Sequence, residues 1–212
     1  MDIGAMVMAI LPEIGLLVLA GVILTLDLVW RASRRWLGWV TAGGALVVLL
    51  LSIFFARPEA TQADLLFGGM LRLDATSFVF RLIFVTGAGI TALFAMHHEI
   101  IGHRGEFYTL MLISTLGMSL MASAADLILL FLAIETTSLP LYILAGFLTR
   151  DDKSVEAGIK YMLYGAVTSA IMLYGFSLLY GFTGTTNLYQ IAVGLLPGGG
   201  LPEIGPAMAL LL

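Results

Sequence analysis

Long apolar segments separated by short polar stretches dominate this sequence. Residues 37–56 and 107–125 contain no charged residue, and the uncharged stretch 161–202 is longer still. A membrane-spanning helix needs about 20 apolar residues, whereas a strand of a transmembrane barrel needs only about 10 residues of alternating polarity. The pattern therefore predicts an all-α fold, a polytopic bundle of transmembrane helices.

Six complete spans and the start of a seventh are predicted. The complete spans cover about residues 12–30, 37–56, 75–97, 107–124, 126–148 and 155–181. Residues 182–205 form a long loop, in which Asn187 is expected to cap a short amphipathic helix at 188–195. A truncated span starts near residue 206. Because no internal repeat or soluble domain boundary is evident, residues 1–212 are expected to form a single membrane domain.

The composition supports a membrane protein and excludes several kinds of chemistry. Hydrophobic residues make up 60% of the chain and charged residues only 11%, against about a quarter in soluble domains. The absence of cysteine excludes disulfides, thiolate zinc sites and Cys-ligated iron–sulfur clusters. His97, His98 and His103 lack the i, i+4 spacing of a helical metal pair, so no metal site is expected. A net charge of −4, with no basic run longer than the pair Arg34 and Arg35, argues against nucleic-acid binding.

Positive charges are distributed unevenly among the predicted loops. The first, third and fifth loops hold Arg31, Arg34, Arg35, Arg104, Arg150 and Lys153. The second and fourth loops hold Arg57 and Arg72, and the loop 182–205 has no Lys or Arg. Because Lys and Arg are enriched on the cytoplasmic side, the N-terminus and the loop 182–205 are predicted to lie outside.

Most ionisable residues of the predicted spans lie near span ends. Glu13 and Asp27 are interpreted as helix-end charges close to water, and Arg81 as a side chain that extends outward to the interface. Asp74 and Asp126 precede apolar runs and are predicted N-caps.

Glu135 is the exception, because it lies about 13 Å into the fifth span, near the middle of a hydrocarbon core about 30 Å thick. A glutamate at that depth must be neutral, paired, or in contact with a hydrated cavity. Pro140 cannot donate to the carbonyl of Thr136, so a helix kink is predicted beside Glu135, with nearby hydroxyls available for freed carbonyls. A proton-carrying role is favoured, and a neutral Glu135 bonded to a neighbouring helix is the structural alternative.

A second charged cluster opens the sixth span. Glu156 and Lys160 are four residues apart and are predicted to form an ion pair on one helix face. Lys160 lies about 9 Å from the predicted N-cap, Ser154. The pair either takes part in a proton path or is simply solvated at the cytoplasmic end of the helix.

The fifth and sixth spans resemble the subunit N family of the proton-pumping NADH–quinone oxidoreductases, respiratory complex I. The specific part is residues 131–187, with FLAIE at 131–135, SLPLY at 138–142, LAGF at 144–147, SVEAGIKY at 154–161 and YGFTGTTNL at 180–188. Weaker likeness at 11–14, 72–74 and 106–108 extends the resemblance over essentially the whole chain.

The resemblance implies an antiporter-like fold related to Mrp-type subunits, with about fourteen helices in two inverted repeats. Glu135 matches the family's glutamate, which pairs with a lysine on the seventh span. Glu156 and Lys160 match the acidic and basic positions that start the sixth span. Because Leu212 precedes the seventh-span lysine and the second repeat, the chain resembles the N-terminal portion of that subunit.

The predicted function is that of a proton-translocating membrane-arm subunit, which carries protons through Glu135, Lys160 and Glu156. By the resemblance, NADH, FMN, iron–sulfur clusters and quinone belong to partner subunits, and no cofactor is expected in this chain. Other membrane-arm subunits and the lipid bilayer are the expected partners, in the inner (plasma) membrane of a bacterium. An Mrp-type sodium/proton antiporter subunit and a structural assembly module are the alternatives.

The topology gives a first testable prediction. Cysteines introduced at Ala32 and Asp152 should be shielded from impermeant thiol reagents in intact cells, whereas one at Gly199 should be labelled. Labelling of a cysteine at position 32 from outside would reverse the assigned orientation.

Overall fold

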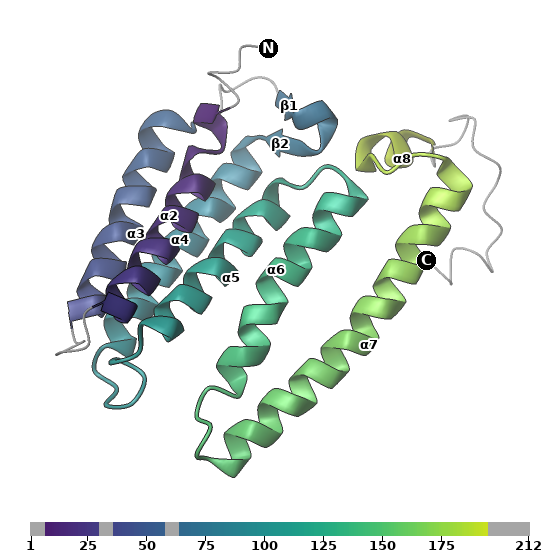
Figure 1. The fold of residues 1–212 in the computed structure, drawn as a ribbon. Coiled ribbons are helices and arrows are strands. Elements are labelled where there is room, and N and C mark those ends of the chain that lie inside the picture. Colours follow the sequence, from purple (N-terminus) through teal and green to yellow (C-terminus); the bar gives the residue numbers. More distant parts are fainter. Residues whose placement is uncertain (1–6, 30–35, 58–63, 195–212) are drawn as a thin grey trace.

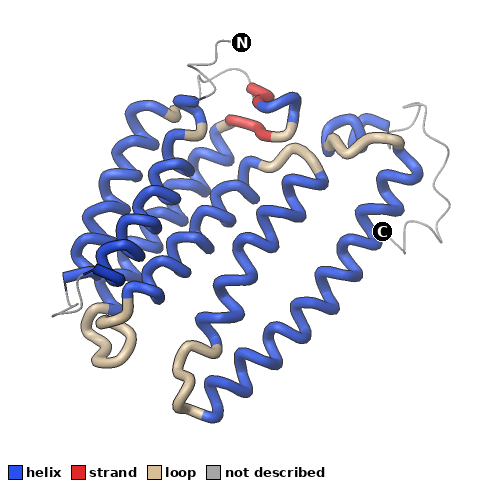
Figure 2. Tube along the Cα trace, viewed as in Figure 1, coloured by secondary structure: helices blue, strands red, loops and turns tan. Residues whose placement is uncertain are grey.

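The computed structural model describes residues 7–29, 36–57 and 64–194. Six long helices run back and forth and place their connections at two ends (Figures 1 and 2). They are α2 (Leu11–Val29), α3 (Trp36–Phe55), α4 (Ala75–Ala95), α5 (Gly105–Ser123), α6 (Leu127–Ala145) and α7 (Asp152–Thr183). The short helix α8 (Leu188–Gly194), a 3₁₀ turn (Phe67–Gly69) and a hairpin of strands β1 (Asp64–Leu66) and β2 (Leu71–Leu73) complete the described part.

Each long helix coincides with a predicted span to within a few residues. Five of them, α2, α3, α4, α6 and α7, are long and apolar enough to cross a membrane. The sixth, α5, is not among these candidates, because its apolar residues alternate with Ser, Thr and Gly. The predicted start of a seventh span, near residue 206, lies outside the described residues.

Helix α5 is the centre of the bundle and packs against α2, α4 and α6. Its buried hydroxyls are bonded either to its own backbone or to neighbouring helices. Thr115 donates to the carbonyl of Met111 at 2.8 Å, and Ser114 donates to the carbonyl of Thr137 on α6 at 3.1 Å. A helix enclosed by other helices needs less apolar surface than one that faces lipid.

The apolar core lies among α2, α3, α4 and α5. Its largest fully buried side chains include Leu16, Ile23, Leu37, Tyr108 and Leu112. Helix α6 packs on α5, and within the described residues α7 packs chiefly against α6, at one edge of the bundle (Figure 1). With 32 residues, α7 is about 48 Å long, well beyond a hydrocarbon core of about 30 Å.

The predicted N-caps are confirmed at three positions and wrong at one. Asp74 accepts from the amide of Ser77 in a capping box, Asp126 accepts from two amides of α6, and Asn187 accepts from two amides of α8. Helix α7 is capped by Asp151 and not by Ser154. The Ser154 hydroxyl instead donates to the carbonyl of Ala145 at 3.0 Å, because it faces the end of α6.

The hairpin β1–β2 was not predicted from the sequence. Its strands pair antiparallel, with Leu65 opposite Arg72, and join through a turn in which Gly68 and Gly69 have positive φ. Strands of three residues give too little alternation to be recognised in a sequence. The hairpin lies at the ends of α4 and α5, against which β2 packs (Figure 1).

The close contact between α5 and α6 gives a testable prediction. A Cβ atom at Gly117 would lie 2.5 Å from Thr137 Oγ1 and 2.6 Å from its backbone nitrogen. Gly117→Ala should therefore lower the free energy of unfolding by about 1–3 kcal/mol. The control Gly87→Ala, where a Cβ would meet nothing within 4 Å, should raise it by about 0.5–1 kcal/mol. Thermal unfolding in detergent measures both, and equal effects would contradict the packing argument.

Candidate functional site

Glu135 lies on the face of α6 that meets α7. Its side chain is half-buried, and Ser169 of α7 donates a hydrogen bond to its Oε1. The partner of the glutamate is therefore a serine that the sequence analysis did not single out. A hydroxyl donor suits an ionised carboxylate, and the same hydroxyl can accept from a protonated one, so Ser169 accommodates both states of Glu135.

The hydroxyls that follow Glu135 make local bonds. Thr136, Thr137 and Ser138 each donate to the carbonyl four residues earlier, at 2.7–2.9 Å. They therefore do not bond to the Thr136 carbonyl that Pro140 leaves without its usual donor. Helix α6 continues through Pro140 to Ala145 as one element, and a functional kink at that residue stays a prediction.

The predicted ion pair between Glu156 and Lys160 is present on α7. Both side chains are exposed, at 62% and 63%, so the pair lies on a face of α7 that the described helices do not cover. Since α7 begins at Asp152, Lys160 is about 12 Å into the helix, deeper than the sequence suggested. Ser169 lies nine residues further along α7, which separates Lys160 from the Glu135 contact by about 14 Å along the helix axis.

A buried ion pair that the sequence did not predict joins α2 to α4. Arg81 Nη2 lies 2.8 Å from Glu13 Oε1, and the two residues are only 2% and 6% exposed. Ser119 of α5 donates to the same Glu13 oxygen at 2.7 Å, and Arg81 Nε donates to the Ser119 hydroxyl at 3.4 Å. Three residues from three helices thus form a closed polar triad.

The triad corrects the interpretation of Glu13 and Arg81 as interfacial charges. Arg81 points into the bundle because an acidic partner and a small serine lie at the same level of two neighbouring helices. The signal was present in the sequence: Glu13 is the third residue of α2 and Arg81 the seventh of α4, so from the same end their depths differ by only about 6 Å. Asp27, also interpreted as interfacial, is 5% exposed and packs against Gly105 at the start of α5.

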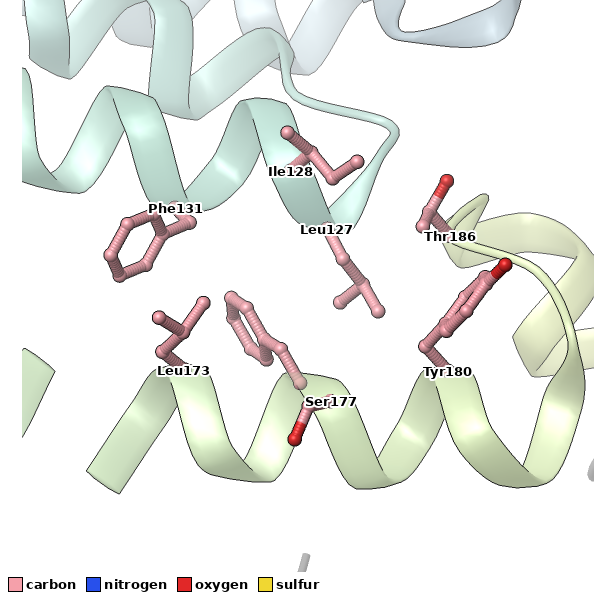
Figure 3. Close-up of a pocket in the computed structure, with 8 residues that line it drawn as sticks. Leu127, Ile128, Phe131, Leu173, Ser177, Tyr180 and Thr186 are labelled. Atoms are coloured by element: carbon pink, nitrogen blue, oxygen red, sulfur yellow. The ribbon is translucent and has the colours of Figure 1, made fainter. Parts of the chain in front are cut away.

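A cavity of about 340 Å³ lies between α6 and α7 near their hairpin-side ends (Figure 3). Apolar side chains from both helices line it, with Phe131 and Leu173 facing each other across one end and Tyr180 beside Thr186 at the other. Because its lining contains no carboxylate or amine, this cavity suits an apolar group and not a charged one.

The sequence is similar to known membrane proteins. Residues 124–211 match the family described as NADH:quinone oxidoreductase/Mrp antiporter, TM. NADH-quinone oxidoreductase subunit N from Desulfovibrio desulfuricans is 40% identical over 188 residues, which cover 87% of this chain and 36% of the relative. The protein of the same name from Anaeromyxobacter sp. is 39% identical over 186 residues, with the same two shares covered.

Solved structures agree with the sequence relatives. A chain in the structure of respiratory complex I from Thermus thermophilus with bound aureothin has a TM-score of 0.67 and 32% identity, covering 89% of this chain and 42% of that one. A chain of the Mrp complex from Dietzia sp. has a TM-score of 0.71 at 24% identity, covering 94% and 22%, and shows likeness of fold alone. The predicted resemblance to subunit N is confirmed, and the chain spans well under half the length of these curated relatives.

The buried triad gives a prediction about stability. Arg81→Met should lower the free energy of unfolding by about 3–5 kcal/mol, because it leaves the Glu13 charge buried without its partner. The double variant Glu13→Leu with Arg81→Met should recover most of this loss, since both charges are then gone. Lys160→Met, which opens the exposed pair, is the control and should cost no more than about 1 kcal/mol. Thermal unfolding of the purified protein in detergent tests this, and equal losses for Arg81→Met and the double variant would contradict it.

Proposed function

We propose that this chain, a helical membrane protein similar to NADH-quinone oxidoreductase subunit N, is part of a proton-translocating subunit in the membrane arm of such an enzyme. The observation that carries the proposal is the placement of Glu135. It is a carboxylate about 12 Å into an apolar helix, half-buried and bonded to a hydroxyl of the adjacent helix. In a membrane, an ionisable group so placed is a functional candidate by default.

The joint between α6 and α7 suits a group that must change its protonation state. The two helices come within backbone contact at one point, where a Cβ on Gly158 would lie 2.7 Å from the Cα of Gly146. Tyr142 of α6 also packs closely against Gly165 of α7, and a cavity opens between the two helices beyond Phe131. Glu135 thus lies between a closely packed part of the joint and the cavity, and it is proposed to exchange its Ser169 partner for water from the open side.

Glu156 and Lys160 are proposed to serve the cytoplasmic end of the same path. Because they are separated from Glu135 by about 14 Å, a proton must cross water or residues beyond those described between the two sites. The exposed face of α7 that bears this pair is the side from which such groups would approach. Lys160 is thus assigned a role at the entrance, and Glu135 the central loading step.

The redox chemistry is proposed to belong to partner subunits. A chain without cysteine offers no thiolate ligands for iron–sulfur clusters, and its resemblance implies that NADH, FMN and quinone bind elsewhere in the complex. This chain then contributes proton carriage within a bacterial plasma membrane, with its N-terminus outside. Its six long helices are proposed to be six spans, with α5 shielded from lipid by its neighbours.

An Mrp-type sodium/proton antiporter subunit is the second candidate, favoured by the match of residues 124–211 to the family described as NADH:quinone oxidoreductase/Mrp antiporter, TM. The two candidates differ in what drives transport. Sodium-dependent proton movement that persists without quinone reduction would favour the antiporter, whereas strict dependence on quinone reduction would favour the oxidoreductase subunit.

The assignment of Glu135 is tested by replacing it with Gln in the full-length subunit within the assembled complex. Glu135→Gln keeps size and hydrogen bonding but forbids ionisation, so most proton pumping into membrane vesicles should be lost while the complex still assembles. The control Glu99→Gln changes an exposed loop carboxylate and should pump normally. Normal pumping by Glu135→Gln, with the subunit shown to be incorporated, would refute the assignment.

Lys160→Ala should reduce pumping less than Glu135→Gln, because water can replace an exposed entrance group more readily than a half-buried carrier. The double variant should lose less than the sum of the two effects, expressed as free energies, if both residues serve one path. Strict additivity, measured in the same vesicles, would place Lys160 outside the path of Glu135.

A further inference from the structure

A small cavity adjoins the Glu13–Arg81 pair beneath the hairpin. Its volume is about 10 Å³, close to the space needed by one water molecule. Glu13 of α2, Arg81 of α4 and Ser123 of α5 line it from the helices, Arg72 lines it from β2, and Ala9 closes it before the start of α2. The rest of the lining is apolar, from Ile10, Leu66, Leu71, Leu73 and Leu120. Charged groups of three different elements therefore meet at a small, otherwise apolar cavity.

Some polar atoms around this cavity have hydrogen-bond partners and others have none within the described part of the chain. Glu13 Oε2, Arg72 Nε and Arg81 Nη1 are all buried and have no hydrogen-bond partner among the residues that the structure describes. They comprise one acceptor and two donors, and each would be costly to bury unpaired. A water molecule has the complementary set, because it accepts two hydrogen bonds and donates two.

We propose that this cavity binds one ordered water, which accepts from Arg72 Nε and Arg81 Nη1 and donates to Glu13 Oε2. A dry cavity of this size is expected where the lining is apolar, whereas buried waters occupy sites with two to four polar partners. The three atoms belong to residues already fixed by other bonds: Arg81 by Glu13, and Arg72 by Asp74 at 2.9 Å. Other contacts therefore hold the polar groups of the site in place, independently of the water.

The position of Arg72 gives this water a connection to the surface. Its side chain is 35% exposed, and its guanidinium lies 5.1 Å from the centre of the Tyr189 ring on α8. Arg72 therefore lies both at the cavity and at the surface on the hairpin side of the bundle. The water thus links the buried carboxylate of Glu13 to that surface, and its use as an access route for protons rests on the proposed function.

A density map of the assembled complex, at a resolution that shows ordered waters, tests the site directly. Density within hydrogen-bonding distance of both Glu13 Oε2 and Arg81 Nη1 is expected. A map that resolves other buried waters but shows none here would overturn the proposal. Because this result does not depend on pumping, it tests the water site independently of the role of Glu135.

A cavity-filling variant tests the site independently in solution. Ala9→Val should displace the water and lower the thermal unfolding midpoint by several degrees, because it leaves three polar atoms unsatisfied. In the background Glu13→Leu with Arg81→Met, the same change should leave the midpoint unchanged or raise it, since most of the polar lining is gone. A decrease of equal size in both backgrounds would mean a simple steric clash and would overturn the proposal.

Discussion

A buried ion pair holds together the part of the molecule on which the other helices depend. Glu13 and Arg81 are withdrawn from water at the junction of α2, α4 and α5, where a lone charge would be prohibitively expensive. The pair therefore fixes the height and the rotation of α2 and α4 relative to each other. Ser119 completes it and places α5 between them, so that α5 can offer its other face to α6.

The contacts become looser from this centre toward α7. Helix α6 is fixed to α5 through the close approach of Gly117 to the Thr137 backbone. Helix α7 is fixed to α6 near Gly146 and Gly158, by Tyr142 against Gly165, and through the bond between Ser169 and Glu135. The charged residues accordingly differ in kind. The Glu13–Arg81 pair is buried between helices of the core, whereas Glu135 is half-buried at the joint of α6 and α7 and bonded to one hydroxyl.

The hairpin-side ends of the helices are joined by polar contacts between segments far apart in the sequence. Asn187 donates to the carbonyl of Gly69 at 3.2 Å, Thr186 donates to Asp126, and Arg72 donates to the Tyr189 hydroxyl. Through these bonds the loop after α7 is attached both to the start of α6 and to the hairpin above the buried pair. The end of α7 is thereby connected to the structure around Arg72.

The sequence by itself determined the helices and several caps and singled out Glu135 as a candidate, because these depend on local composition and on depth along one helix. A run of apolar residues predicts a span, and Glu135 stands out for its distance from both ends of such a run. Tertiary structure decided which side chains meet. Neither the Glu13–Arg81 pair nor the Ser169 partner of Glu135 follows from one helix alone, since each depends on the relative rotation and level of neighbouring helices. The pattern of residues along one sequence does not specify that geometry.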